Sequence, residues 1–259
     1  MANAVKKKEE TNIVTFDTGL FEEDAGKGLS NLGADDLSIP FLRILQDTND
    51  EVKKRHAKYI EGAESGMMFN TLTKQLYDGE QGLQVVPCAY KRELIEWMDR
   101  GKGTGAPVNF HTVSSNILSQ TTRDDQNKDR LNNGNYIEDT ANHFVLIANK
   151  DGTYDQALIA MSRTQRKISK RWNSLMLGLK LKGKNGMFNP PSYSHVYKLT
   201  SFADSNDQGT WFGWEVNRVG PVESQELYET AKNFAESVDK GEVKVKHEEE
   251  TTGSDNTPY

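Results

Sequence analysis

The chain has 259 residues, a formal net charge of -6 and only 35% hydrophobic residues, a composition typical of a folded middle segment with polar ends. No apolar run approaches the ~18 residues that a membrane-spanning helix needs, and the Lys/Glu-rich stretch Met1 to Glu10 lacks the apolar segment of a secretion signal. The lone Cys88 excludes an intrachain disulfide and any zinc site built on several cysteines, and we expect a cytoplasmic protein.

The polar and apolar patterns divide the chain into four segments. We expect a mobile arm over residues 1–37, a β-rich folded domain over 38–220, a helix over 221–241 and an acidic tail over 242–259. The folded domain begins at a dense apolar stretch, Ser38 to Leu45.

Strands dominate the expected secondary structure of the middle segment. Residues 83–90 read as a strand in which Pro87 indicates an edge or a bulge, and residues 92–98 as the next strand or the continuation of a bent one. Asp151-Gly152 predicts a hairpin between 143–148 and 154–161. A second hairpin is expected between 194–202 and 210–219.

One long polar segment and two helices complete the pattern. Residues 101–135 have few periodic apolar positions, which indicates a functional or mobile insertion, or hidden elements. Apolar spacing predicts a helix over 163–181, with Ser162 and Gln165 as a capping box. A second amphipathic helix is expected over 224–240, ending at Gly241.

Charge is unevenly distributed along the sequence. From Gln156 to Ala203 there is no acidic residue, whereas the rest of the chain carries a net charge of -15. This segment holds nine basic residues: Arg163, Arg166, Lys167, Lys170, Arg171, Lys180, Lys182, Lys184 and Lys198. Such a block is the pattern expected of a surface that contacts phosphates, although a solvated helix face would look similar.

Aromatic residues near this block supply a second feature of single-strand binding, because bases stack on exposed rings. The predicted nucleic-acid-binding residues are Lys91, Arg92, Trp97, Arg163, Arg166, Lys167, Lys170, Arg171, Lys182, Lys184, Tyr193, Tyr197, Trp211 and Trp214. Tyr90 is a further stacking candidate. Burial in the core is the commoner fate of a single strand aromatic, and Trp172 on the apolar stripe of its helix is expected in the core.

Several segments together resemble the single-stranded DNA-binding proteins of tailed phages. They include Ile39-Pro40-Phe41-Leu42, Gly66 to Asn70, Val85 to Trp97, Met161 to Asn173 and Pro190 to Trp214, in that order. The resemblance implies an OB-like β-barrel with helical elaborations and a role in phage replication and recombination, in the cytoplasm of the infected host.

The tail carries Glu248, Glu249, Glu250 and Asp255 and ends in Tyr259. We expect these five residues to bind a partner, such as a phage or host DNA polymerase, helicase or recombinase. The tails of this functional class are usually more densely acidic and often end in Phe.

Other function classes are less well supported by the sequence. The five histidines do not form the His-Glu-x-x-His spacing, and phosphate-loop and nucleophile-elbow motifs are absent, so we expect no enzyme, cofactor or metal. The best enzymatic alternative is a metal-dependent nuclease that uses Asp124, Asp125 and Asp129, with Lys128 nearby. A recombination mediator or a polymerase-interacting factor is a third possibility.

Overall fold

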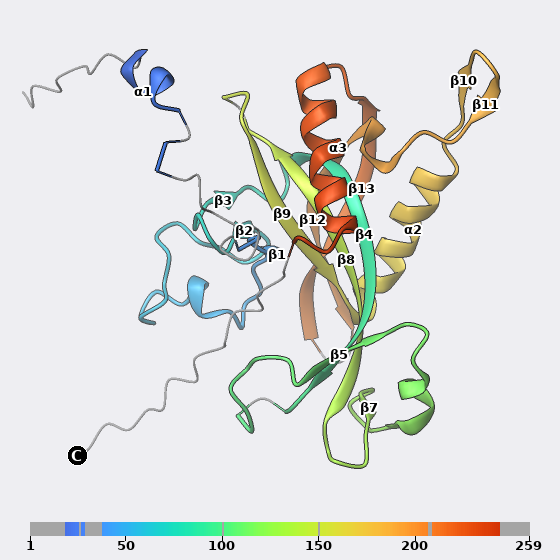
Figure 1. Cartoon of the computed structure of the whole chain (residues 1–259). Helices are drawn as coiled ribbons and strands as arrows, with labels where there is room; N and C mark the ends of the chain where they lie inside the picture. The colour runs from blue at the N-terminus through green and yellow to red at the C-terminus, as the bar shows by residue number, and fades with distance from the viewer. Residues whose placement is uncertain are drawn as a thin grey trace, which may run out of the picture.

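The structure is a computed structural model that describes residues 19–25, 27–28, 38–99, 101–149, 151–206 and 209–243 (Figure 1). Most of the predicted N-terminal arm lies outside this range, apart from the short helix α1 (Gly19–Glu23) and a few neighbours. The five tail residues predicted to bind a partner, Glu248, Glu249, Glu250, Asp255 and Tyr259, also lie outside it. Within the described part of the chain, no helix has the length and apolar character needed to cross a membrane.

The chain is mainly β, with one large sheet curled into a half-barrel and few helices, so the predicted fold class is confirmed (Figure 1). The spine of the sheet is the pair of long antiparallel strands β4 (Leu83–Trp97) and β8 (Tyr136–Ala148). Six strands complete it: β5 (Asn109–Thr112), β6 (Thr122–Arg123), β7 (Asp129–Arg130), β9 (Tyr154–Met161), β12 (His195–Asn206) and β13 (Gly209–Pro221).

The two spine strands have different neighbours along their lengths. β4 pairs with β12 near its start and with β5 near its end, while β8 pairs with β7 near its start and with β9 over the rest. The polar segment 101–135 therefore contains β5, β6, β7 and the 3-10 helix η3 (Asn116–Gln120), elements that its weak periodicity did not reveal.

Pro87 lies at a bulge in β4, which is one of the two positions, an edge or a bulge, that the sequence predicted for it. The register with β8 shifts between Pro87 and Ala89, so that Cys88 is the extra residue. Proline has no N–H to donate to a ladder, and a bulge is one of the few places where a central strand tolerates it. Residues 92–97 continue the same strand beyond the bulge.

Both predicted hairpins are confirmed. β8 and β9 pair across a turn in which Asn149 N–H donates to Thr153 O (2.9 Å) and Gly152 has a φ of +86°. That left-handed backbone conformation is the reason for the glycine. β12 and β13 pair along their whole length, with one irregularity at Val196 and Tyr197.

A second, small sheet faces the concave side of the large one. It consists of β1 (Leu42–Ile44), β2 (Met68–Asn70) and β3 (Leu76–Tyr77). A single-turn 3-10 helix, η2 (Asp50–Val52), lies between β1 and β2 in the chain. Just before β1, Phe41 forms a parallel bridge to Leu158 of β9, and Leu158 N–H donates to Pro40 O (2.8 Å). The chain segment around β1 thus covers the β9 edge.

Glutamine side chains cover the opposite edge of the large sheet. Gln46 donates to Phe212 O (2.9 Å) and accepts from Phe212 N–H (2.8 Å), and Gln165 accepts from Trp214 N–H (3.0 Å). These bonds satisfy backbone groups of the edge strand β13 that have no neighbouring strand, and so prevent it from pairing with another chain.

Two apolar clusters bury the two faces of the sheet. The concave cluster includes Val85, Ile147, Tyr197 and Trp214, while Val86, Phe144 and Leu146 point to the convex side. Helix α3 (Gln225–Asp239) covers the convex side, and its buried residues are those of the predicted apolar face: Leu227, Ala231, Phe234, Ala235 and Val238.

The predicted bounds of α3 agree with the structure. Its first turn is capped by the Ser224 hydroxyl, which accepts from Leu227 N–H (3.2 Å). Gly241 follows the helix with a φ of +76°, as expected of a C-terminal stop.

The basic helix is shorter than predicted, and its capping box is wrong. A 3-10 turn, η4 (Arg163–Gln165), precedes α2 (Arg166–Leu177), and the Ser162 side chain makes no capping bond. Gln165 is instead bonded to β13, and Arg163 has a φ of +48°, which a helix cannot accommodate. Residues 181–188, which the sequence pattern partly assigned to the helix, form a hairpin.

Candidate nucleic-acid interface

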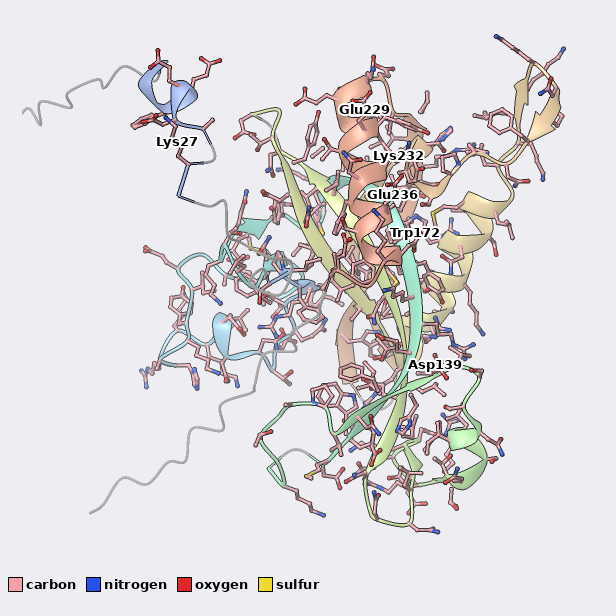
Figure 2. The ribbon with its side chains drawn as sticks, viewed as in Figure 1. Lys27, Asp139, Trp172, Glu229, Lys232 and Glu236 are labelled. Atoms are coloured by element: carbon pink, nitrogen blue, oxygen red, sulfur yellow. The ribbon has the colours of Figure 1, made fainter. Side chains whose placement is uncertain are left out.

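Helix α2 is anchored to the concave side of the sheet by one face. Arg166, Ser169 and Trp172 are three residues apart and are buried, whereas Lys167, Lys170 and Arg171 are exposed. This division follows from the helical period of 3.6 residues, because positions three or four apart share a face. The basic side chains therefore lie on the side of α2 away from the core that fixes the helix. Trp172, labelled in Figure 2, belongs to the buried side of the helix.

Trp172 and His143 form the centre of this anchor. Their rings stack with centroids 4.5 Å apart and planes 16° apart, and His143 Nε2 lies 2.8 Å from Ser169 Oγ. Burial, together with the charge of Arg166, lowers the pKa of His143 from its ordinary 6.5 to about 3. The ring is consequently neutral at neutral pH, and it joins β8 to α2 by stacking and hydrogen bonding.

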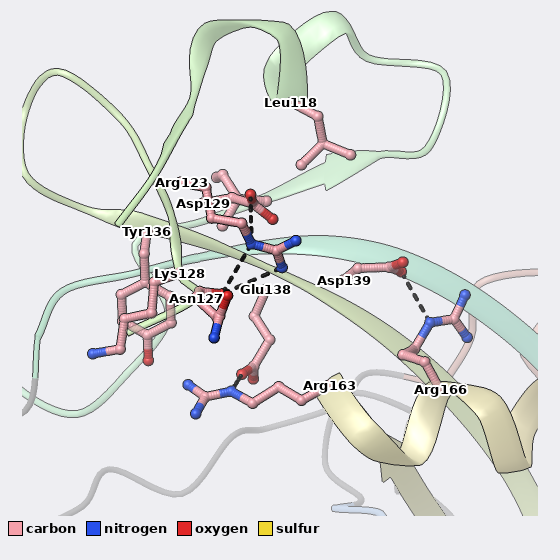
Figure 3. A pocket seen from close by; sticks show the side chains of 11 residues that line it. Leu118, Arg123, Asn127, Lys128, Asp129, Tyr136, Glu138, Asp139, Arg163 and Arg166 are labelled. Carbon is pink, nitrogen blue, oxygen red and sulfur yellow. Dashed lines mark hydrogen bonds and ion pairs between the residues drawn. The ribbon is translucent and has the colours of Figure 1, made fainter. Parts of the chain in front are cut away.

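Acidic residues of β8 neutralise the N-terminal end of the basic block (Figure 3). Glu138 accepts from Arg163 Nε (2.8 Å), and Asp139 lies 3.3 Å from Arg166 Nε. Asp139 also accepts two hydrogen bonds from Arg92, both of 2.8 Å. The predicted phosphate contact of Arg166 is corrected, because its side chain is buried beside Asp139. Arg92 and Arg163 are paired but exposed, so their phosphate contacts stay predictions.

A pocket lies next to these ion pairs, between β6, β7, β8 and η4. It has a volume of about 250 Å³, and Figure 3 shows Arg123, Tyr136 and Arg163 among the side chains that line it. Lys128 lies over the Tyr136 ring at 4.6 Å. Positive and negative groups alternate around the pocket, so it does not present one sign of charge to a ligand.

The chain that follows α2 forms a hairpin that projects from the body of the protein (Figure 1). Its strands are β10 (Leu181–Gly183) and β11 (Gly186–Phe188). A Cβ added to Gly183 would lie 3.1 Å from the Phe188 ring, so the ring covers this glycine. Phe188 is nevertheless 47% exposed and faces solvent with its other side.

The outward side chains of α2 and of the hairpin together form what we call the basic ridge. Its members are exposed and none forms an ion pair with another residue in the described part of the chain: Lys167, Lys170, Arg171, Lys180, Lys182 and Lys184. Five of these six belong to the predicted binding set. Unpaired cations along a continuous stretch of surface give it the positive potential that attracts a polyanion.

Lys91 is placed differently from the prediction. Its Nζ donates to Val238 O at the end of α3 (2.7 Å) and lies 5.9 Å from the centroid of the Phe144 ring. Lys91 therefore contributes to the attachment of α3 on the convex face, on the opposite side of the sheet from α2. It lies apart from the basic ridge, and its contact with nucleic acid stays a prediction.

Two of the predicted stacking residues are in the core. Tyr197 is 1% exposed and Trp214 is 4% exposed, and both belong to the concave apolar cluster with Trp172. A ring enclosed in this way has no free face for a base, so these two assignments are corrected. Tyr193 lies instead in the 3-10 helix η5 (Ser192–Ser194) and packs on the convex side.

The remaining aromatic candidates are partly accessible. Tyr193 packs against Tyr228 with centroids 5.2 Å apart, and Trp97 and Trp211 are half-buried. Tyr90 is 39% exposed and lies beside Arg166, whose Nη1 is 3.4 Å from its hydroxyl. Among these rings, only Tyr90 is exposed near α2.

The predicted binding set did not include Phe188 or Met187, because the sequence pattern did not reveal the hairpin that carries them. The missed signal is the sequence Gly183-Lys184-Asn185-Gly186, whose flanking glycines are typical of a tight turn between two short strands. Gly186 has a φ of +110° there.

Two of the three acidic residues considered for a nuclease, Asp124 and Asp129, lie against basic side chains. Asp124 accepts from Arg130 Nε (2.6 Å), and Asp129 lies 3.7 Å from Arg123 Nε. Lys128 is bonded to Asp99 (3.1 Å). In the part of the chain that the structure describes, no three His, Cys, Asp or Glu side chains are grouped so that they could hold a metal ion.

Comparison with known proteins gives one match. A family model described as Pam3 phage gp34-like protein matches residues 8–244. No curated protein and no solved structure matches the chain.

The neutral His143 makes stability depend on pH. In the unfolded chain the ring binds a proton below its ordinary pKa of 6.5, whereas in the fold it stays neutral down to about pH 3. Stability is therefore unaffected above pH 6.5 and falls as the pH drops through this window, by about 1.4 kcal/mol per pH unit. Between pH 7.5 and 5 we expect His143 to account for a loss of about 2 kcal/mol.

Urea denaturation of the wild type and of His143→Gln at the two pH values measures this contribution. The variant keeps a hydrogen-bonding group for Ser169 but has no titrating ring, so its stability should fall by about 2 kcal/mol less than that of the wild type. An equal fall in both proteins would show that His143 is protonated in the fold.

Proposed function

The chain belongs to the Pam3 phage gp34-like protein family, and we propose that this phage protein binds single-stranded DNA without sequence preference through its basic ridge. The observation that carries the proposal is the ridge itself: six exposed cations, on one face of α2 and on or beside the hairpin, that form no ion pair with any residue that the structure describes. Each phosphate contact releases condensed counterions, which makes such binding favourable and independent of sequence.

The exposed aromatic ring of the hairpin favours single-stranded DNA over duplex DNA as the ligand. Phe188 leaves one face of its ring open on the hairpin that also carries Lys182 and Lys184, with Lys182 on the opposite hairpin face. A base can stack on this ring only if that base is not already stacked within a duplex. A basic surface with an accessible aromatic ring is the usual combination in proteins that bind single strands regardless of sequence. Tyr90 near α2 offers a second accessible ring.

In this proposal the protein covers single-stranded DNA during phage replication and recombination, in the cytoplasm of the infected host, without catalysing a reaction. The acidic tail would recruit a DNA polymerase, helicase or recombinase, and it would compete with DNA for the ridge because its carboxylates have the same sign of charge as phosphates.

The ridge can be tested by neutralising Lys170, Arg171 and Lys182 together with glutamine. If all three contact phosphates, the slope of log K against log salt concentration should become shallower by about 2, since each single-strand contact contributes about 0.7. Fluorescence anisotropy of a labelled oligonucleotide at several salt concentrations measures this slope.

The matched control is the triple replacement of Lys54, Arg55 and Lys58 by glutamine, which removes the same charge from exposed positions far along the chain from α2. Equal slopes for both triple variants would show that only the total charge matters and that the ridge is not the binding surface. Shortening of the oligonucleotide when magnesium is added would indicate the nuclease alternative.

The role of Phe188 has its own test. Phe188→Ala should weaken binding to a single-stranded oligonucleotide by about 1–3 kcal/mol, or roughly 5- to 150-fold, with little change in thermal stability because the ring is half exposed. Phe188→Trp should retain binding. Met187→Ala, on the other face of the hairpin, is the control, and an equal loss in that variant would argue against stacking.

Competition by the tail predicts that deletion of residues 244–259 strengthens DNA binding, most clearly at low salt, where charges are least screened. The measurement is the anisotropy titration at low and physiological salt. If the truncated and full-length chains bind equally at low salt, the tail does not compete for the ridge.

A further inference from the structure

The pocket between β6, β7, β8 and η4 lies where the basic ridge ends, at the start of α2. Arg163 and Arg166 line it from the beginning of the helix, as Figure 3 shows. Lys167, the first exposed residue of the ridge, directly follows Arg166. A DNA strand that runs along α2 toward the first residue of the helix therefore reaches this pocket.

The size and charge of the pocket fit a small neutral group. Its volume of about 250 Å³ is below the ~300–1,000 Å³ of sites for drug-sized molecules, so it suits a group of one or two rings. The charged lining side chains form three pairs of opposite sign, Arg123–Asp129, Arg163–Glu138 and Arg166–Asp139. A phosphate would be repelled by the three carboxylates, whereas a nucleobase is neutral and carries both donors and acceptors on its edge.

Glu138 and Arg163 offer an acceptor and donors side by side. Oε1 of Glu138 accepts from Arg163 Nε (2.8 Å), and among the residues that the structure describes none donates to Oε2. The Arg163 side chain is 60% exposed, and a guanidinium has four N–H donors besides the one on Nε. This pairing of one acceptor with several donors matches the edge of a base better than it matches an ion.

We propose that this pocket takes one base of the bound single strand and prefers a base that carries an exocyclic amino group. The inference rests on the proposed function. The amino group donates to Glu138 Oε2, and a ring acceptor of the same base accepts from Arg163. Carboxylates recognise the cytosine amino group in this way. Thymine has a single N–H on that edge, between two carbonyl oxygens that repel a carboxylate.

The pocket adds a limited preference to binding that the ridge makes largely independent of sequence. Contacts to phosphates do not distinguish bases, and the pocket holds one base out of the several nucleotides that the ridge covers. In a duplex the amino group is already bonded to the opposite strand, and the base must leave the stack before it can enter a pocket. The pocket therefore favours single strands, as the exposed ring of Phe188 does.

Oligodeoxycytidine and oligodeoxythymidine of equal length test the proposal, since both are pyrimidines with rings of the same size. Fluorescence anisotropy with the full-length chain should show tighter binding of the cytosine strand. Glu138→Ala should lower the ratio of the two affinities by at least ~3-fold, because it removes the acceptor for the amino group. The ratio is the useful quantity, since the lost negative charge strengthens the binding of both strands alike.

Glu80→Ala is the matched control and should leave the ratio unchanged. It removes the same charge from an exposed position before the start of β4, whereas Glu138 lies opposite Ile95 near the end of that strand. The proposal is overturned if Glu138→Ala keeps the wild-type ratio, as it would if another segment of the chain filled the pocket, or if Glu80→Ala lowers the ratio equally. Binding of both strands with an unchanged ratio leaves the proposed function intact. Failure of the wild type to bind either strand overturns the proposed function and this inference with it.

A modified strand gives a second readout that needs only the wild-type protein. Replacing each cytosine by its dimethylamino derivative keeps the ring but removes both amino hydrogens. The wild type should bind this strand at least ~3-fold more weakly than the cytosine strand, because the carboxylate no longer receives a hydrogen bond. Glu138→Ala should bind the two strands with equal affinity. Equal affinities for the wild type would contradict recognition of the amino group.

Discussion

The ladder between β4 and β8 is the constraint on which the rest of the structure depends. The two strands are hydrogen-bonded from Gln84–Ala148 to Trp97–Tyr136, and every other strand of the large sheet, β6 and β13 included, is attached to one of them directly or through a neighbour. The bulge after Pro87 bends β4, which curls the sheet and separates its concave and convex faces. One face then accepts α2 and the β1 segment, and the other accepts α3.

The buried and the exposed basic residues of the basic segment differ in whether they need a charged partner. Arg166 is buried, and a buried guanidinium is tolerated only beside a carboxylate, so Asp139 pairs with it and also holds Arg92. The ridge lysines remain in water, where an unpaired ammonium group carries no such cost. The fold thus uses the arginines nearest the sheet to position α2 and leaves the lysines beyond them exposed to solvent.

The sequence alone determined the features that depend on local patterns. Asp151-Gly152 specified a hairpin, the spacing from Leu227 to Val238 specified the buried face of α3, and the lack of acids between Gln156 and Ala203 located the basic block. Pro87 indicated an edge or a bulge, because a missing N–H restricts a strand wherever it lies. Tertiary structure decided everything that requires a partner distant in sequence. Only the curled sheet brings Glu138 to Arg163 of η4 and Asp139 to Arg166 of α2, and only it encloses Tyr197 and Trp214. Whether an aromatic side chain becomes core or surface depends on which face of the sheet is covered, and a strand's alternation shows only that two faces exist.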